Sequence, residues 1–343
     1  MRRYARTIAV FALFLPVPAL VAQEDPLQAS RAGERWVLTA AGDSAVLETS
    51  EGRSLRLALP DKALVSSLAA LDGGWMAAGS YLNGERRALF LLKGDARGAR
   101  SLPVPAGQEG LLRFGPVLLT EGDGRLAGMA WLEGDGLRTL GVRAAAWNGE
   151  RWEAPVRVAP PGPGSQLALS GAVLADGSWL LAWSAFDGAD DEILWSLRAA
   201  DGTWSKARRL SADNAVPDIT PAVTASGDGA LIAWSRFDGQ GYSVHLARFA
   251  GGGWRGERAA APTGSVRPAF ESSSGRPLLL YRTVVPAAWS VLQLDPAGRA
   301  LARATVPSSL PDRPVLVTGA GGEVRMRWPA AAREVAVSFE GTP

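Results

Sequence analysis

Short apolar runs joined by tight Gly and Asp turns recur along most of the chain. Val37 to Ser50 (VLTAAGDSAVLETS) aligns without a gap with Ala222 to Ser235 (AVTASGDGALIAWS). Seven such strand pairs follow one another, most of them about 45–55 residues apart. Their turns are anchored at Ser44, Gly74, Gly124, Gly177, Gly229, Gly275 and Gly322. A short unit repeated at this spacing predicts one supersecondary structure copied around an axis.

The clearest unit runs from about Thr220 to Trp254 and contains four short apolar runs separated by Gly-rich turns. Such a pattern is typical of an antiparallel meander, and four-stranded meanders repeated at this length are β-propeller blades. We therefore predict an all-β fold, a β-propeller of about seven four-stranded blades; six blades plus a closing segment is the alternative. Because the last unit lacks a fourth run, we expect the N-terminal segment to supply missing strands to the last blade and so close the ring.

Tryptophans recur in register with these units. The second run of a unit carries Trp131, Trp183, Trp234 and Trp328, and the fourth run opens with Trp152, Trp204 and Trp254. A propeller needs bulky side chains to fill the wedge between twisted sheets. The regular spacing therefore predicts packing between blades rather than sugar stacking.

The N-terminus has the pattern of a secretory signal. A basic MRRYAR segment precedes the apolar run TIAVFALFLPVPALVA, which is short and contains Pro16 and Pro18. We expect cleavage after Ala22, with Ala19 as the alternative. The prediction is a signal peptide at 1–22 and a single β-propeller domain at 23–343, exported to the periplasm or secreted, with no membrane span after cleavage.

Composition excludes several kinds of chemistry. The chain has no Cys, which excludes disulfides, a thiolate nucleophile and lipid attachment at cysteine. His245 is its one histidine, so His/Cys zinc sites are excluded and a Ser-His-Asp triad is disfavoured. Without Arg2, Arg3 and Arg6 of the signal, 33 basic and 34 acidic residues remain, a net charge of −1. This balance argues against a nucleic-acid partner, and we expect a monomer.

One turn between the third and fourth runs resembles a known motif. Asp201-Gly202-Thr203-Trp204 is similar to the tail of the Asp-box, S-x-D-x-G-x-x-W, of the sialidase-like β-propeller superfamily, and segments 147–152 and 251–254 look like degraded copies. The resemblance covers roughly residues 35 to 340 at fold level. It implies architecture and not activity, because the Asp-box is a turn that stabilises the fold. The Arg-x-Pro motif that sialidases carry early in the catalytic domain is absent here.

Charged residues cluster where the resemblance places the mouth of the central channel. Four residues lie one to three positions before the Pro of an innermost strand: Arg113, Asp218, Arg267 and Arg313. Asp187 and Asp238 lie in the loops between second and third runs. We predict that these six side chains line one opening and bind an anionic or hydroxyl-rich ligand through Arg forks. The alternative is that the arginines pair with neighbouring acids.

The acidic run from Asp187 to Glu192 allows a second interpretation, in which carboxylates hold Ca²⁺; the alternative is a solvated turn, and no other cofactor is expected. We interpret the chain as a binding or interaction module for a glycan, a peptide or an envelope protein. A sialidase-like glycoside hydrolase or lyase acting at the propeller mouth is the alternative function.

Overall fold

The structure of the chain is a computed structural model that describes residues 25–31, 33–211, 214–271, 276–318 and 323–341. The predicted signal peptide lies outside the described residues, as do the two turn anchors Gly275 and Gly322. No helix in the described ranges is long and apolar enough to cross a membrane.

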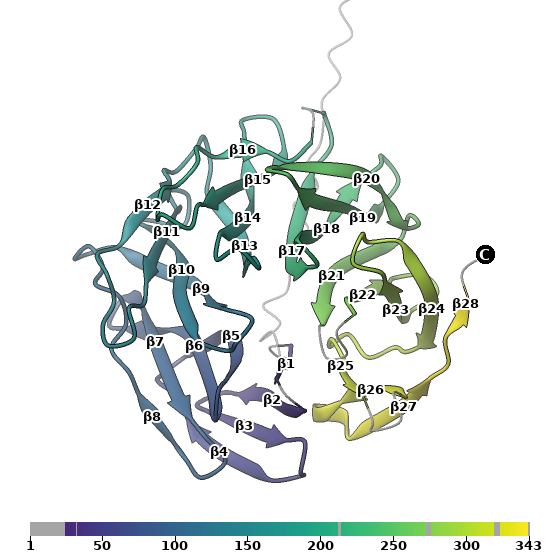
Figure 1. Ribbon diagram of the computed structural model, residues 1–343, viewed down its shortest axis with the longest axis horizontal. Coiled ribbons are helices and arrows are strands. Elements are labelled where there is room, and N and C mark those ends of the chain that lie inside the picture. Colours follow the sequence, from purple (N-terminus) through teal and green to yellow (C-terminus); the bar gives the residue numbers. More distant parts are fainter. Residues whose placement is uncertain (1–24, 32, 212–213, 272–275, 319–322, 342–343) are drawn as a thin grey trace, which may run out of the picture.

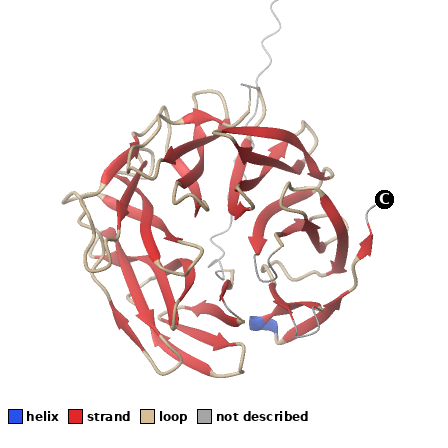
Figure 2. Cartoon of the chain, in the orientation of Figure 1, coloured by secondary structure: helices blue, strands red, loops and turns tan. Residues whose placement is uncertain are grey.

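Seven antiparallel sheets stand around a central axis and form a closed ring (Figure 1). Apart from one short 3₁₀ turn at Pro329–Ala331, the regular structure in the described ranges is strand (Figure 2). The prediction of an all-β propeller with about seven blades is confirmed, and the six-blade alternative is wrong.

Blades 1 to 6 each contain four consecutive strands, numbered from the axis outward. Blades 1 to 3 are β1 (Leu27–Arg31), β2 (Glu34–Ala41), β3 (Ser44–Thr49), β4 (Ser54–Ala58); β5 (Leu64–Leu71), β6 (Gly74–Asn83), β7 (Arg86–Gly94), β8 (Ala99–Ser101); and β9 (Leu112–Thr120), β10 (Leu126–Gly134), β11 (Gly141–Ala146), β12 (Val156–Ala159). Blades 4 to 6 are β13 (Gln166–Val173), β14 (Trp179–Phe186), β15 (Asp191–Arg198), β16 (Arg208–Arg209); β17 (Asp218–Ser226), β18 (Gly229–Phe237), β19 (Tyr242–Ala250), β20 (Gly253–Ala261); and β21 (Ser265–Glu271), β22 (Leu278–Thr283), β23 (Ala288–Leu294), β24 (Ala300–Pro307).

Blade 7 has three strands, as its sequence predicts. They are β25 (Val315–Thr318), β26 (Val324–Trp328) and β27 (Arg333–Val337). The last strand, β28 (Glu340–Gly341), pairs with β24 and so extends blade 6 to five strands.

The first repeat is shifted by one strand from its predicted place. The Val37–Ser50 pair forms β2 and β3, the second and third strands of blade 1, whereas its match at Ala222–Ser235 forms the first and second strands of blade 5. The innermost strand of blade 1 is β1, which pairs antiparallel with β2. This explains why the first anchor, Ser44, stands only 30 residues before Gly74, whereas later anchors are 46 to 53 residues apart.

The prediction that the N-terminal segment supplies missing strands to the last blade is also wrong. The N-terminal strand β1 belongs to blade 1, and no described N-terminal residue pairs with a strand of blade 7. Side chains close the ring instead. Gln28 Nε2 donates to Leu316 O at 2.7 Å, and Arg327 Nη2 contacts Glu48 Oε2 at 2.5 Å. We call this contact between blades 1 and 7 the seam.

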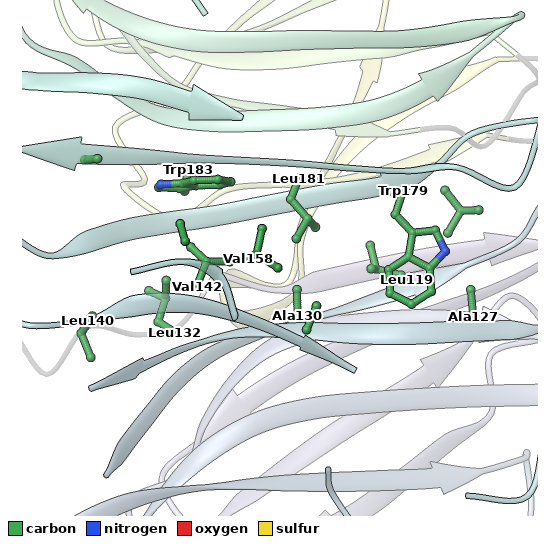
Figure 3. Packing of buried hydrophobic residues seen from close by; sticks show 14 residues of the cluster. Leu119, Ala127, Ala130, Leu132, Leu140, Val142, Val158, Trp179, Leu181 and Trp183 are labelled. Carbon is green, nitrogen blue, oxygen red and sulfur yellow. The ribbon is translucent and has the colours of Figure 1, made fainter. Parts of the chain in front are cut away.

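The apolar core lies between blades, and the tryptophans are central to it. Trp131, Trp183 and Trp234 are fully buried, and each packs with residues of the preceding blade. Figure 3 shows Trp179 of β14 beside Leu119 of blade 3, and Trp183 of β14 near Val142 of the same blade. The prediction that these rings fill the wedges between sheets is confirmed. Each blade is thereby held by its neighbours, and the loops at the two ends of the strands have a rigid base.

Candidate functional site

The ring has two faces that carry different connections. The innermost strands of all blades run in the same direction along the axis, so their first residues lie at one face together with the loops between second and third strands. We call this the loop face. The opposite face carries the turns between first and second strands and between third and fourth strands, and we call it the turn face.

All six residues singled out from the sequence lie at the loop face. Arg113, Asp218 and Arg267 are in the first three residues of β9, β17 and β21, and Arg313 precedes β25. Asp187 and Asp238 directly follow β14 and β18. Their partners within the protein show which of them come together.

Arg267 and Arg313 meet at one carboxylate, that of Asp25. Arg267 Nη2 donates to Asp25 Oδ2, and the backbone N–H of Arg313 donates to Asp25 Oδ1 at 2.9 Å. Their remaining bonds go to backbone carbonyls, from Arg267 Nη1 to Pro311 at 2.9 Å and from Arg313 Nη2 to Pro26 at 3.1 Å. These contacts join blades 6 and 7 to the segment that precedes blade 1, so they extend the seam onto the loop face.

Arg267 has an unusual backbone as well. Its φ is 59°, in the left-handed region that a residue with a Cβ enters at a cost of about 1–2 kcal/mol. Gly115, Ala168 and Thr220 take similar values near the starts of β9, β13 and β17, where the pairing register shifts. A bulge near the start of the innermost strand therefore recurs in several blades. It sets the direction in which the first residues of that strand leave the sheet.

Arg113 stands apart from the other five residues. Its Nη1 donates to Pro105 O at 3.0 Å, within the connection that leads into blade 3. Burial lowers the pKa of this guanidinium, against the opposing influence of Glu133 and Tyr81. No hydrogen bond or ion pair among the described residues joins Arg113 to the other predicted site residues.

Asp218 is fully buried and faces the inside of blade 5. Its carboxylate accepts hydrogen bonds from Arg236, Nε to Oδ1 and Nη2 to Oδ2, both at 2.7 Å, and from Trp234 Nε1 at 3.2 Å. The bonds from Arg236 raise the pKa of that guanidinium. Arg236 also contacts Glu257 on the outermost strand. The group is a polar crosslink through the blade, with no surface of Asp218 left for a ligand.

Asp187 is paired with Arg209, whose Nη2 lies 2.6 Å from Asp187 Oδ2. The other oxygen, Oδ1, accepts the backbone N–H groups of Ala189 and Asp190, and these bonds lower the pKa of Asp187. Arg209 Nη1 also lies 3.8 Å from Glu192 Oε1. Burial raises the pKa of Glu192 to about 7.

One oxygen each of Asp187, Asp190 and Glu192 lies within 4.8 Å of the others, close enough for one cation to contact all three. Arg209, however, already brings a positive charge to this group. Asp238 on the neighbouring blade accepts bonds from Thr263 and from the backbone of Gln240 and Gly241, which lower its pKa. The predicted loop-face residues thus all have partners within the protein, but of the three arginines only Arg267 has an ion pair with an acid among the described residues. Ligand binding by these residues stays a prediction.

The turn face has a cavity of about 650 Å³ between blades 2 and 3. Blade 2 contributes Lys93, Arg100 and Met76 to its lining, and blade 3 contributes Arg125 and Trp147. We call this cavity the groove. Its volume falls in the range of small-molecule sites, and its wall mixes apolar and charged side chains as such sites do.

Trp147 is the aromatic wall of the groove. It follows β11, and its ring stands against Trp152 with centroids 5.0 Å apart in an edge-to-face arrangement. Trp152 in turn donates from Nε1 to Pro103 O at 2.8 Å, a bond that links the opening of the fourth strand of blade 3 to the connection from blade 2. The Trp147 ring is therefore held in place by the junction that it lines.

The turns around the groove are built by Asp and Asn caps. Asn148 Oδ1 accepts the backbone N–H groups of Glu150 and Arg151 at 3.0 and 2.9 Å. In blade 4, Asp201 Oδ1 accepts the N–H of Thr203 at 2.9 Å at the corresponding turn. These caps rigidify the turn face; the identification of Asp201–Trp204 as an Asp-box stays a prediction.

Sequence reasoning did not select the groove. Its lining comes from residues up to about 80 positions apart in two blades, and their proximity depends on how the blades pack. One signal was present: Trp147 to Trp152 stood out as a copy of the Asp-box turn. The sequence predicts a packing role for Trp152 and assigns none to Trp147.

No family model matches this chain, and no curated protein matches its sequence. Solved structures do share its fold. An ulvan lyase of polysaccharide lyase family PL25, bound to -[GlcA(1-4)Rha3S]-, is similar over 93% of this chain and 94% of its own, with a TM-score of 0.57 and 10% identity. The six-bladed Aleuria aurantia lectin, with its fucose recognition mode, is similar over 83% of this chain and 96% of its own, with a TM-score of 0.52 and 13% identity.

A protein of unknown function from Dyadobacter fermentans is similar over 82% of this chain and 96% of its own, with a TM-score of 0.51 and 12% identity. At these identities the likeness shows the fold alone. The class of protein is a β-propeller, in agreement with the fold-level resemblance to sialidase-like propellers.

Proposed function

We propose that this chain is an exported propeller that binds carbohydrate in the groove between blades 2 and 3. The observation that carries the proposal is a cavity of about 650 Å³ with the Trp147 ring on one side and charged side chains around it.

The chemistry of the groove suits a sugar. A pyranose ring has an apolar face of C–H bonds that packs on an aromatic ring, and a rim of hydroxyl groups that need hydrogen-bond partners. Trp147 offers the ring surface. Asp72, Glu121 and Glu150 line the same cavity and offer acceptors, while Lys93 and Arg100 offer donors.

The fold neighbours support this class of ligand without identifying it. A fucose-recognising lectin and a lyase bound to a saccharide share the architecture. The alternative, a hydrolase or lyase at the loop face, needs two carboxyl groups available for acid and base work. Asp187 and Asp218 are each bonded to an arginine there, which favours binding over catalysis.

The experiment is isothermal titration with a panel of oligosaccharides against wild type and Trp147→Ala. We expect at least one sugar to bind wild type, and Trp147→Ala to weaken it about tenfold, which corresponds to about 1.4 kcal/mol of lost ring contact. Trp147→Phe keeps an aromatic face and should recover most of the affinity.

Phe186→Ala is the matched control, because Phe186 is an exposed aromatic at the loop face. It should bind as wild type does. Equal binding by wild type and Trp147→Ala, with both folded by near-UV circular dichroism, would reject the groove as the site. Export is tested separately by N-terminal sequencing of protein from the native host, which should begin near Leu20 or Gln23; an intact Met1 would refute it.

A further inference from the structure

The hairpin of β7 and β8, at the outer side of the groove, carries a group of exposed cations. Lys93 is the penultimate residue of β7, Arg97 lies in the turn and Arg100 is on β8. They line a second cavity of about 480 Å³, the hairpin cavity. Lys93 and Arg100 also line the groove, so the two cavities are neighbours that share these two side chains.

The arrangement of these cations is unfavourable for the isolated protein. Lys93 and Arg100 are direct partners in the antiparallel pairing of β7 and β8, so their side chains leave the same side of the hairpin. Like charges directly opposite each other destabilise a sheet. No described carboxylate lies within ion-pair distance of Lys93, Arg97 or Arg100. An anionic ligand would remove this repulsion.

The acid in the hairpin cavity is already engaged. Asp95 Oδ1 accepts the backbone N–H groups of Arg97 at 2.7 Å and Gly98 at 3.2 Å, and so holds the turn in shape. The other nearby acids, Asp72, Glu121 and Glu150, line the groove and not the hairpin cavity. Glu121 is in addition paired with Arg125 at 2.5 Å.

Charge therefore changes from one cavity to its neighbour. The part beside Trp147 has a mixed lining suited to a neutral sugar ring, and the part beside the hairpin is positive. Arginine forks and a lysine ammonium are the groups that bind carboxylate and sulfate oxygens most strongly.

We propose that the groove and the hairpin cavity together bind one chain of an anionic polysaccharide. A sugar ring packs on Trp147, and a carboxylate or sulfate group of a neighbouring residue of the polysaccharide is held by Lys93, Arg97 and Arg100. This rests on the proposed carbohydrate-binding function and adds the class of carbohydrate.

The test compares three soluble polysaccharides, dextran, dextran sulfate and polygalacturonate, by biolayer interferometry at two salt concentrations. Wild type should bind one or both of the anionic polymers at least tenfold more tightly than dextran, and the preference should shrink as salt rises. A preference for polygalacturonate would assign a carboxylate ligand, and a preference for dextran sulfate a sulfate ligand.

The variant is the triple substitution Lys93→Gln, Arg97→Gln and Arg100→Gln. All three side chains are exposed, so the fold should be retained, and anionic binding should fall at least tenfold, to the level of dextran. The matched control removes the same charge elsewhere, through Arg56→Gln, Arg138→Gln and Lys206→Gln, which are exposed and line neither cavity. It should keep the preference.

Two results would overturn this inference while leaving carbohydrate binding intact. One is binding that depends on Trp147 but shows no anionic preference; the other is an equal loss in the triple variant and its control, which would indicate attraction by overall charge. Tighter binding of poly-glutamate than of any polysaccharide would overturn it in favour of an acidic peptide. If Trp147→Ala changes nothing and the triple variant alone loses binding, the joint site is overturned. Anion binding would then belong to the hairpin cavity alone, and the groove would not be the carbohydrate site.

Discussion

Arginines lie at both faces of the ring, but the partners of two loop-face arginines, Arg236 and Arg267, differ from those of the hairpin arginines, Arg97 and Arg100. At the loop face, Arg236 binds Asp218, and Arg267 binds Asp25, so the charge is compensated within the protein. At the turn face, Arg97 and Arg100 have no ion-pair partner among the described residues and stand beside cavities. The difference teaches that an arginine at a channel mouth is no guide to a ligand until its partners are known.

We expect side chains of the loop face to contribute to stability and those of the hairpin at the turn face to contribute to ligand binding. Loop-face ion pairs connect strands within a blade, as in blade 5, or connect blade 6 to the segment that precedes blade 1. Removing them should change stability and leave binding unchanged. Removing Lys93, Arg97 or Arg100 should do the reverse, because these side chains hold no other element in place.

The largest effect is expected from Asp218→Ala, which leaves the Arg236 guanidinium and the Trp234 N–H without their buried acceptor. Loss of one partner of a buried ion pair costs about 3–5 kcal/mol. Guanidinium chloride unfolding should show a decrease of that size, while polysaccharide affinity below the transition stays at the wild-type value. Asp228→Ala removes an exposed partner of Arg248 and should cost less than about 1 kcal/mol. A stable Asp218→Ala protein with weakened binding would reverse the roles of the faces.

A second effect, of about 3 kcal/mol, is expected from the pH dependence of stability. Glu271 ends β21 at the turn-face side, and burial raises its pKa from 4.5 to about 7. The native protein then keeps a proton that the unfolded chain releases, so stability should fall as pH rises from about 4.5 to about 7 and level off above. Glu271→Gln should remove this part of the decline in unfolding experiments at pH 5 and pH 8. Identical pH profiles for both proteins would show that Glu271 ionises normally.

The smallest effect is expected at Asp25. Asp25→Ala removes the acceptor of Arg267 and of the Arg313 backbone, in a partly exposed place, and should cost about 1–2 kcal/mol. Hydrogen exchange should quicken in β1 and β25 and remain unchanged in blades 3 and 4. Glu51→Ala, in an exposed pair with Arg53, serves as the control. A loss of polysaccharide binding in Asp25→Ala would contradict the assignment of the loop face to structure.

Much of the fold could be predicted because each blade repeats a local pattern. The tryptophans at 131, 183 and 234 and the Gly turns fix strand order within a blade, and that order needs only nearby residues. The sequence pattern misaligns blade 1 because β1 has only five residues and no Gly-Asp pair separates it from β2 in the sequence. The closure was missed for another reason: Gln28 and Leu316 are 288 residues apart, and a side-chain contact leaves no pattern in either segment.

The candidate site could be predicted from the sequence less well than the fold. Strand ends placed six charged residues at the loop face, but their partners are distant in sequence, as with Arg267 and Asp25, 242 positions apart. The groove needs Trp147 and Lys93 from different blades, and only the packing of those blades brings them to one cavity.

The seam between blades 1 and 7 has a consequence for how the molecule comes apart. Six of the seven junctions are crossed by the chain itself, whereas the seam is held by side chains such as Gln28 and Arg327 and by their neighbours. In a row of units that contact only their neighbours, loss of a terminal unit costs one interface and loss of an internal unit costs two. Once the seam opens, blades 1 and 7 become terminal units. Partial unfolding should therefore begin at both ends and proceed inward, and the groove between blades 2 and 3 loses its support only after blade 1 is lost.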